Sequence, residues 1–513
     1  MFYKVQSGAV MGVNGYMVDV EVDITNGLPA FDIVGLPDSA VKESRERVKA
    51  AIRNTGFTFP VKRVTINLAP TAVRKSGPAF DLPIAVGILI CSGMLKNLPP
   101  LFTNAFFAGE LSLDGALRPV AGILPMAMEA KAQGIRAFFV PKQNAEEAAL
   151  VGDVDVYPVE NLEALTRHLS GSSHLQMITI NQEEFFLSGK NTYDVDFADI
   201  AGQTLLKRAM EVAAAGYHNT LMIGPPGAGK TMIARRMPTI LPSLSTDESM
   251  EITKIYSIAG LLNSDTFLVK QRPFRVPHHT ASFISLAGGG KNPMPGEISL
   301  AHNGILFLDE LPEFQKKALE TLRQPMEDGN ITITRAGGVC TYPSVFLLLA
   351  AMNPCPCGYM GTERCTCTTN ETAKYLSKIS GPLLDRIDIQ IEAIPVAYKD
   401  LSANSRTTNA ENSATIKTRV ENARAIQQKR FKNELIYFNA KMTTPLIEKH
   451  CKLSSAADDL VRQVFDTMSL SPRAYHKILK IARTIADLAD QENITENHIA
   501  EAISYRGQDR KYW

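Results

Sequence analysis

The sequence lacks a long uninterrupted apolar run. Its most apolar stretch, Ala79–Met94, contains Asp81 and Pro83 and is shorter than the ~20 residues that a membrane-spanning helix needs. The opening residues, MFYKVQSGAV, also lack the basic segment and apolar core of a secretory signal peptide. We therefore expect no membrane contact and a cytoplasmic location.

Excess charge is missing as well, because 54 Lys and Arg residues balance 53 Asp and Glu residues to a net charge of +1. No basic field covers the whole chain, so any nucleic-acid contact must come from locally gathered Lys and Arg. Cysteine is scarce, with seven in 513 residues. In the cytoplasm such residues are more typical of thiols or metal ligands than of disulfides. Internal repeats and low-complexity segments are also missing, which argues against a repeat architecture.

What is present is an ordinary globular composition, 45% hydrophobic and 21% charged, over a length that fits two to four domains. Two polar stretches are typical of linkers and divide the chain into five segments. These are 1–170, with mixed strand and helix patterns; 171–191, a linker; 192–398, with alternating strands and helices; 399–412, a second linker; and 413–513, with helical periodicity. The alternation in the third segment predicts a parallel α/β sheet.

A phosphate-binding loop lies between an apolar strand pattern and a helical run, which is the context that the G-x-x-x-x-G-K-T motif requires. Backbone N–H groups of such a loop and the following helix N-terminus bind phosphate oxygens. Lys230 is expected to reach the β- and γ-phosphates of ATP, and Thr231 to bind Mg²⁺. The loop consists of Gly224, Pro225, Pro226, Gly227, Ala228, Gly229, Lys230 and Thr231.

Two further apolar runs end in polar residues. Gly304–Leu308 is followed by Asp309 and Glu310, and such carboxylates stand where α/β sheets place their ligands. We expect Asp309 to hold Mg²⁺ and Glu310 to polarise the attacking water. The second run, Val345–Met352, is followed by Asn353. Asn353 is expected to position the same water, although Asn also ends strands as a turn residue.

Other motifs extend over nearly the whole chain. They are Gly202-Gln203, Arg275-Val-Pro-His-His-Thr280, Gly288-Gly-Gly290, Pro295-Gly-Glu-Ile-Ser-Leu-Ala-His302, Asn353-Pro-Cys-Pro-Cys-Gly358, Leu384-Asp-Arg-Ile-Asp388 and Ser471-Pro-Arg-Ala474. With the phosphate loop, this set resembles the ComM/YifB family of magnesium-chelatase-like AAA+ ATPases. The resemblance implies an AAA+ P-loop sheet with a C-terminal helical lid, assembled into a homo-oligomeric ring that is expected to be a hexamer.

The resemblance also assigns roles. Asn353 matches the sensor-1 position, Arg386 the arginine finger that reaches a neighbouring subunit's γ-phosphate, and Arg473 the sensor-2 position of the lid. The alternative for Arg386 is an ion pair with Asp385 or Asp388, and that for Arg473 is a surface charge. The implied function is an ATP-hydrolysing DNA motor, a branch-migration helicase of recombination and natural transformation. A magnesium chelatase subunit and a protein-remodelling ATPase are the alternatives.

The stretch Ser257–Leu300 resembles an insert that faces the ring pore, and the alternation in Ile331–Arg335 predicts a hairpin strand. Lys291 and Arg335 are candidates for contacts with DNA phosphates, with solvated surface charges as the alternative. For His278 and His279 a structural role in a loop is favoured over metal binding, because no third ligand lies nearby in sequence.

Cys355, Cys357, Cys365 and Cys367 are close enough in sequence to form a tetrahedral Zn²⁺ site. The alternative is a reduced surface loop or redox-labile pairs. The adjacent Asn353 would place such a metal near the nucleotide.

Residues 1–170 resemble the α+β domain of Lon proteases, through stretches such as Gly77–Ala85 and Gly109–Gly115. Where active members carry a Ser nucleophile and a Lys base, this sequence has Ala79 and, approximately, Leu124. Neither side chain can attack a carbonyl or accept a proton. The proteolytic dyad is therefore absent, and we expect a binding or ring-assembly domain.

Overall fold

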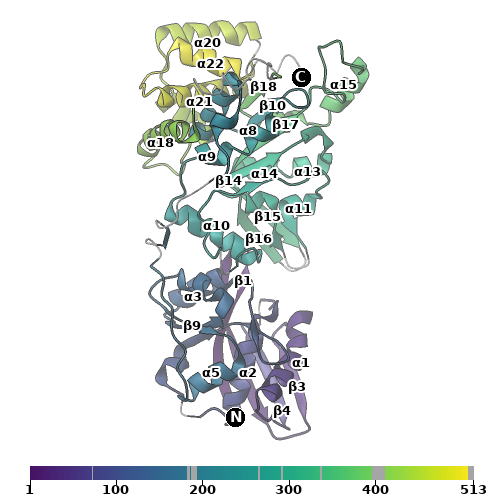
Figure 1. The fold of residues 1–513 in the computed structure, drawn as a ribbon, viewed down its shortest axis with the longest axis vertical. Helices are drawn as coiled ribbons and strands as arrows, with labels where there is room; N and C mark the ends of the chain where they lie inside the picture. Colours follow the sequence, from purple (N-terminus) through teal and green to yellow (C-terminus); the bar gives the residue numbers. More distant parts are fainter. Residues whose placement is uncertain are drawn as a thin grey trace.

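The structure is a computed structural model that describes residues 1–506 apart from 72, 97, 182–184, 187–192, 264–265, 291–292, 336–337, 396–410 and 469. Figure 1 shows an elongated molecule with the N-terminal sheet at one end, the parallel sheet that carries the phosphate loop in the middle and the C-terminal helices at the other end. Among the described residues, no helix combines the length and the apolar character that crossing a bilayer requires.

The N-terminal part is a seven-stranded mixed sheet, ordered β3-β4-β2-β1-β5-β8-β9. β1 and β2 form a long antiparallel hairpin, and β5, β8 and β9 continue the sheet in parallel. The strands are β1 Phe2–Met11, β2 Asn14–Thr25, β3 Ala30–Val34, β4 Arg63–Ala69, β5 Ala105–Phe107, β8 Ala137–Pro141 and β9 Asp155–Val159. The helices are α1 Ser39–Asn54, α2 Asp81–Cys91, α3 Ile123–Ala132, α4 Ala145–Ala149 and α5 Leu162–Leu169.

The middle part confirms the predicted parallel α/β sheet. Its five strands are parallel and ordered β11-β14-β17-β10-β18. They are β10 Thr220–Ile223, β11 Phe274–Arg275, β14 Gly304–Leu308, β17 Phe346–Met352 and β18 Ile389–Glu392. In β14, Ile305 and Phe307 pack into one core while Leu306 and Leu308 pack into another. Both faces of the sheet are therefore covered, which explains the continuous apolar runs in the sequence.

Helices and short hairpins connect these strands. The helices are α7 Thr204–Gly216, α8 Lys230–Ala234, α9 Met237–Ile240, α10 Thr246–Ile258, α11 Phe283–Ala287, α12 Glu297–Leu300, α13 Lys316–Glu320, α14 Arg323–Asp328, α15 Thr369–Leu376 and α16 Gly381–Leu384. The hairpins are β12 Gly288–Gly289 with β13 Met294–Pro295, and β15 Asn330–Arg335 with β16 Gly338–Pro343. The second of these confirms the hairpin predicted from the alternation before Arg335.

The C-terminal part is helical, as expected. It consists of α18 Ser413–Arg430, α19 Thr444–His450, α20 Ser455–Met468, α21 Pro472–Leu488 and α22 Glu496–Ser504. A buried ion-pair network joins these helices, because Asp487 accepts hydrogen bonds from both Arg430 and Arg483. Buried residues of α21 and α22 share one core with the strand side chains of the P-loop sheet. The helical part is thereby packed firmly against the sheet.

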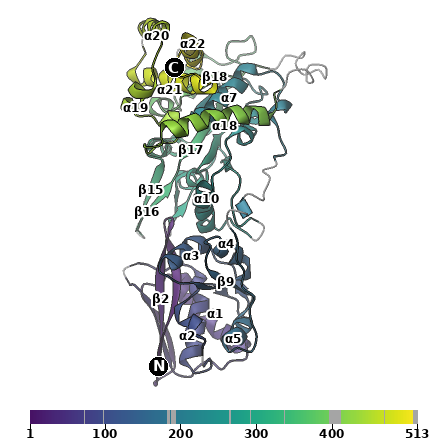
Figure 2. The same cartoon turned by 90° about the vertical axis from the view of Figure 1, so that its left-hand side faces the viewer.

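The N-terminal part contacts the P-loop part at a narrow waist. Figure 2 shows the tip of the β1–β2 hairpin reaching the β15–β16 hairpin, and Val13 at that tip packs into the core beneath the P-loop sheet. Beside it, the buried Glu147 accepts hydrogen bonds from the Ser257 hydroxyl at 2.5 Å and the Leu124 backbone N–H at 2.9 Å. A carboxyl group of one part therefore bonds to a helix of the other.

Two described residues of the segment predicted as a linker, 171–191, contact the neighbouring parts of the chain. Ile178 donates its backbone N–H to Val156 and so extends the edge of the N-terminal sheet. The ring of Phe185 lies against that of Phe267, with centroids 4.6 Å apart and planes tilted by 31°, and the ammonium of Lys270 lies over its face. Ile178 and Phe185 pack because the neighbouring parts of the chain offer them partners. The composition of the segment alone could not reveal those contacts.

Candidate functional site

The phosphate-binding loop lies at the carboxyl end of the central strand β10. Its first residue continues the sheet, because the Gly224 N–H donates to the Met352 carbonyl at 3.2 Å. A Cβ at this position would stand 2.3 Å from the Ala393 carbonyl oxygen, so only glycine fits. Gly227 and Gly229 have φ of 77° and 81°, the left-handed conformation that turns the chain into α8. The backbone N–H groups at the start of α8 are thus free to meet an anion.

Lys230 points back across this loop. Its ammonium donates to the Gly224 and Pro225 carbonyls, at 2.6 and 3.0 Å, and to Asn353 Oδ1 at 3.2 Å. Burial lowers the pKa of Lys230, while the nearby Asp309 carboxylate acts in the opposite direction. A bound phosphate would supply the counter-charge that the buried ammonium favours. The structure thus brings together two predicted residues that are 123 positions apart in sequence.

The donor set beside the loop suits a magnesium ion. Thr231 donates its hydroxyl to Asp309 Oδ2 at 2.6 Å, so a hydroxyl and a carboxylate oxygen already face each other. Mg²⁺ prefers oxygen ligands of this kind, completed by water and nucleotide phosphates. The arrangement fits the predicted pairing of Thr231 with Asp309.

Glu310 occupies a strained backbone position at the end of β14. Its φ is 53°, an uncommon conformation for a residue with a side chain, and such strain often marks functional positions. Its carboxylate is exposed and lies 3.2 Å from Nδ1 of His279. Sequence reasoning missed this partner, because it weighed the His pair only as a metal site or a loop element. The motif Arg275–Thr280 was the available signal.

Arg386 and Arg473 lie near the amino ends of strands β10 and β18, whereas the phosphate loop lies at the carboxyl end of β10. β10 and β18 are parallel, and their register pairs Thr220 with Ile389 at one end and Ile223 with Glu392 at the other. Arg386 precedes β18, and its carbonyl accepts a hydrogen bond from Asn219 Nδ2 at 3.1 Å, at the amino end of β10.

The span from Asn219 to the loop at Gly224 is about 16 Å of extended chain. Arg473, at the start of α21, is 74% exposed and lies 3.4 Å from Asp385 Oδ2, on the same side as Arg386. The structure therefore does not bring either arginine to the phosphate loop of its own chain.

The alternative ion pair named for Arg386 is wrong in its partner. Neither Asp385 nor Asp388 pairs with it; Glu327, at the end of α14, does so. Asp388 instead accepts from the Asn219 backbone N–H at 3.2 Å and lies near His218. Arg386 Nε is buried and has no hydrogen-bond partner among the described residues. The guanidinium therefore retains donor capacity beyond its intramolecular pair.

The four cysteines of the predicted metal site converge. Their sulfur atoms all lie within 4.8 Å of one another, and Cys355 is buried. Hydrogen bonds from the backbone N–H groups of Tyr359 and Thr366 hold the pKa of Cys357 at about 6, below its ordinary value. The cluster stands directly after Asn353, at the carboxyl end of β17.

The two DNA-contact candidates are only partly described. Lys291 lies outside the described residues. Arg335 is the last residue of β15, and its backbone pairs with Gly338 across the hairpin. The hairpin is in place, and its role with DNA stays a prediction.

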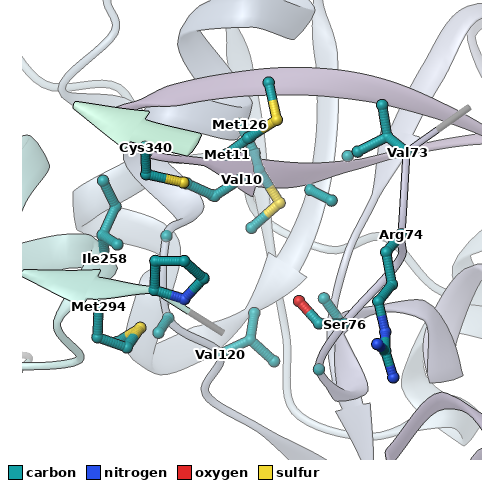
Figure 3. Close-up of a pocket in the computed structure, with 18 of the residues that line it drawn as sticks. Val10, Met11, Val73, Arg74, Ser76, Val120, Met126, Ile258, Met294 and Cys340 are labelled. Atoms are coloured by element: carbon teal, nitrogen blue, oxygen red, sulfur yellow. The ribbon is translucent and has the colours of Figure 1, made fainter. Parts of the chain in front are cut away.

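A cavity of about 290 Å³ lies between the N-terminal part and the β15–β16 hairpin (Figure 3). Ala79 lines it at the predicted nucleophile position, together with apolar side chains such as Val120 and Met126. Leu124 does not line it; its side chain packs at the waist with Phe267 and Leu268. No lysine is among the described residues that line this cavity. The absence of a proteolytic dyad stays a prediction, since Ser76 and Cys340 also line the cavity.

Comparisons with known proteins give one family for most of the chain. Residues 196–401 match the family model described as magnesium chelatase, subunit ChlI. Residues 20–144 match subunit ChlI of Mg-chelatase, and residues 410–506 match the ChlI C-terminal model.

Among curated proteins, competence protein ComM of Haemophilus influenzae is 44% identical over 510 residues, covering 99% of this chain and 97% of the relative. The uncharacterized protein YifB of Escherichia coli is 42% identical over 508 residues, with the same coverage. A Lon protease of Brevibacillus choshinensis is 24% identical over 182 residues, covering 32% of this chain and 23% of that protein.

Proposed function

The chain belongs to the family of magnesium chelatase subunit ChlI, in the group that contains ComM and YifB, and from this premise we propose that it is an ATP-hydrolysing ring motor that acts on DNA. The observation that carries the ATPase half is the meeting of Lys230, Thr231, Asp309 and Asn353 at one edge of the sheet. Phosphoryl transfer needs positioning and charge stabilisation, and these groups supply both.

Each residue has a distinct role in this proposal. The loop from Gly224 to Thr231 binds the phosphates, and Lys230 stabilises charge on the β- and γ-phosphates. Thr231 and Asp309 would hold Mg²⁺, which neutralises phosphate charge when it is bound. Glu310 accepts a proton from the attacking water. Asn353, already bonded to Lys230, orients the γ-phosphate and that water.

The two arginines support an assembly in which each ATP site lies between subunits. Arg386 and Arg473 stand at the edge of the sheet remote from their own phosphate loop, so they are positioned to serve a neighbour. A head-to-tail interface that repeats this contact closes into a ring when its rotation allows. A hexamer is the form that we propose. Glu327 must release Arg386 for the finger to extend.

DNA is the client that the family relationship favours. One full-length relative is named a competence protein, and competence is the capacity to take up DNA. Branch migration during recombination of that DNA is the specific reaction we propose. A near-neutral chain can drive it, because a pore needs only a local ring of phosphate contacts. Arg335 at the hairpin and Lys291 are the proposed contacts.

Magnesium chelation and protein remodelling are the competing functions. The family models bear the chelatase name, including the one that matches residues 20–144. We favour the DNA motor because the Lon-protease likeness and the cysteine cluster have no evident use in inserting a metal into a porphyrin. We propose that segment 1–170 serves binding or ring assembly, since Ala79 stands at the nucleophile position in its cavity and no lysine is among the described lining residues.

The test is the steady-state ATPase rate of the full chain with and without single-stranded and branched DNA, for the wild type and Lys230→Ala. We expect a rate that DNA stimulates and that Lys230→Ala abolishes. A rate abolished by the substitution but indifferent to DNA would retain the ATPase and transfer the client to a protein or tetrapyrrole. Unchanged hydrolysis by Lys230→Ala would remove the proposed site.

A further inference from the structure

The sulfur atoms of the four cysteines after β17 lie within 4.8 Å of one another. Cys355 Sγ lies 3.4 Å from Cys357 Sγ and 3.9 Å from Cys365 Sγ, and the latter two sulfurs are 3.7 Å apart. Cys367 Sγ accepts the Cys357 backbone N–H at 3.3 Å. Four thiolates at such distances would repel one another, and a cation at their centre would offset that repulsion.

The dimensions fit one tetrahedral ion. With Zn–S bonds of about 2.3 Å, the edge of the tetrahedron is about 3.8 Å, close to the observed sulfur separations. Disulfides do not fit, since an S–S bond is about 2.05 Å long and would join only two of four equivalent neighbours. A multi-iron cluster would hold its cysteines farther apart, because the cluster itself occupies the centre. A single ion with four sulfur ligands is the chemistry that remains, and zinc is its usual occupant.

This cysteine loop also supports the nucleotide site. Gly358 follows the second cysteine, and a Cβ on it would lie 2.5 Å from Pro226 Cδ of the phosphate loop. Past the fourth cysteine, Thr368 caps helix α15, whose buried Tyr375 receives a hydrogen bond from the Asn353 backbone N–H. Gly358 of the cysteine loop therefore lies against Pro226 of the phosphate loop, and helix α15, which follows the cysteine loop, contacts Asn353.

We propose that Cys355, Cys357, Cys365 and Cys367 bind one structural Zn²⁺, and that this ion holds the cysteine loop against Pro226 and Asn353 so that ATP binding depends on it. The zinc site stands on the sulfur geometry alone, while the coupling to ATP rests on the proposed function. Removing the ion frees the loop, and both contacts with the nucleotide site are then lost.

The first experiment measures metal content. The untagged full chain, purified under reducing conditions, is analysed by inductively coupled plasma mass spectrometry. We expect one zinc per chain in the wild type and less than one tenth of that in Cys365→Ser/Cys367→Ser. Cys91→Ser is the matched control, since its sulfur donates to the Val22 carbonyl and a hydroxyl can do the same; it should keep its zinc. Well under one zinc in the wild type, or stoichiometric iron, would overturn the zinc site.

The second experiment separates metal binding from coupling. In Gly358→Ala all four ligands remain but the new Cβ displaces Pro226, so we expect full zinc and ATP affinity weaker by about tenfold or more. Gly361→Ala is the control, because its φ of 81° is equally unfavourable for alanine while nothing lies within 4 Å of its Cβ.

ATP affinity is measured with a fluorescent ATP analogue, and thermal unfolding checks that both variants fold. Equal affinity in the two variants would overturn the coupling. A wild type that holds zinc but binds no nucleotide would overturn the coupling and the proposed function while leaving the metal site.

Discussion

The two sheets of this chain border sites of different character. The N-terminal one is a volume of about 290 Å³ lined by Ala79, Val120 and Met126, with no lysine among its described lining residues. The carboxyl ends of the P-loop strands instead pair the Lys230 ammonium with the Asn353 amide oxygen, at 3.2 Å, and the Thr231 hydroxyl with the Asp309 carboxylate, at 2.6 Å. Size and apolar lining alone are therefore poor guides to chemistry in this molecule.

The difference separates the fold of the N-terminal part, which is similar to that of a Lon protease, from the reaction, for which Ala79 offers no nucleophile. Ala79 stands where the Lon resemblance expects a nucleophile, yet the surrounding core is fully formed. Such a sheet can still serve as a rigid support, and here it bonds to α10 through Glu147. The P-loop sheet instead buries a charged group, Lys230, and burying a charge is costly, which favours a functional role for it.

The largest effect is expected at Arg386, the arginine proposed to complete a neighbour's site. Arg386→Ala should lower the ATPase rate by about 10³-fold or more, because a finger stabilises charge in the transition state. Mixing this variant with Lys230→Ala should restore activity at about one quarter of the interfaces, since each then contributes the residue the other lacks. ATPase assays of the mixture check this, with exposed Arg462→Ala as the control. Absence of rescue would place Arg386 outside a shared site.

The catalytic carboxylate should come next. Glu310→Gln should lower the rate by ~10²–10⁴-fold, because an amide cannot accept the proton of water. ATP should still bind and remain on the protein, which filter retention of labelled nucleotide measures. Glu313→Gln is the matched control, since Glu313 pairs with Lys378 at the surface. Rapid turnover by Glu310→Gln would exclude the role proposed for Glu310.

A smaller effect is expected at the waist that joins the two sheets. Burial raises the pKa of Glu147, while the hydroxyl of Ser257, its strongest opposing contact, acts to lower it. The ionised carboxylate is therefore disfavoured in the folded protein, and its contribution to stability falls as pH rises through the raised pKa. Ser257→Ala removes one donor and should destabilise by about 1–3 kcal/mol above that pKa and by less below it.

Thermal unfolding followed as the pH is raised stepwise from below the ordinary pKa of a glutamic acid measures this difference. The control is Ser504→Ala, whose hydroxyl bonds a carbonyl in its own helix. Equal losses at every pH would show that the ionised form of Glu147 is not what Ser257 stabilises.

The smallest effect is expected for Ala79→Ser, which should not give the protein peptidase activity. Ala79→Ser returns a hydroxyl to the N-terminal cavity, but the substitution supplies no base to activate it. Fluorogenic peptides and casein should stay uncleaved, and the ATPase rate should change by less than about twofold, as for substitutions away from a site. Detectable cleavage would show that the cavity keeps a base that the lining does not suggest.

Local sequence was enough to predict part of this molecule. The strand, loop and helix around Gly224–Thr231 and the apolar strands β14 and β17 lie where the pattern placed them, because each is specified by consecutive residues. The Glu327 partner of Arg386 and the His279 partner of Glu310 were missed. Both depend on how separate loops pack against the sheet, and no spacing in the sequence encodes that.

The sequence by itself determined the chemistry that this chain has available: a phosphate loop, paired carboxylates after a buried strand, four close cysteines and no nucleophile at position 79. The tertiary structure alone decided their arrangement. The parallel register of β10 and β18 carries Arg386 and Arg473 away from their own phosphate loop, and loop packing sets Gly358 against Pro226. Such distances follow from contacts between distant segments, which only the folded chain defines.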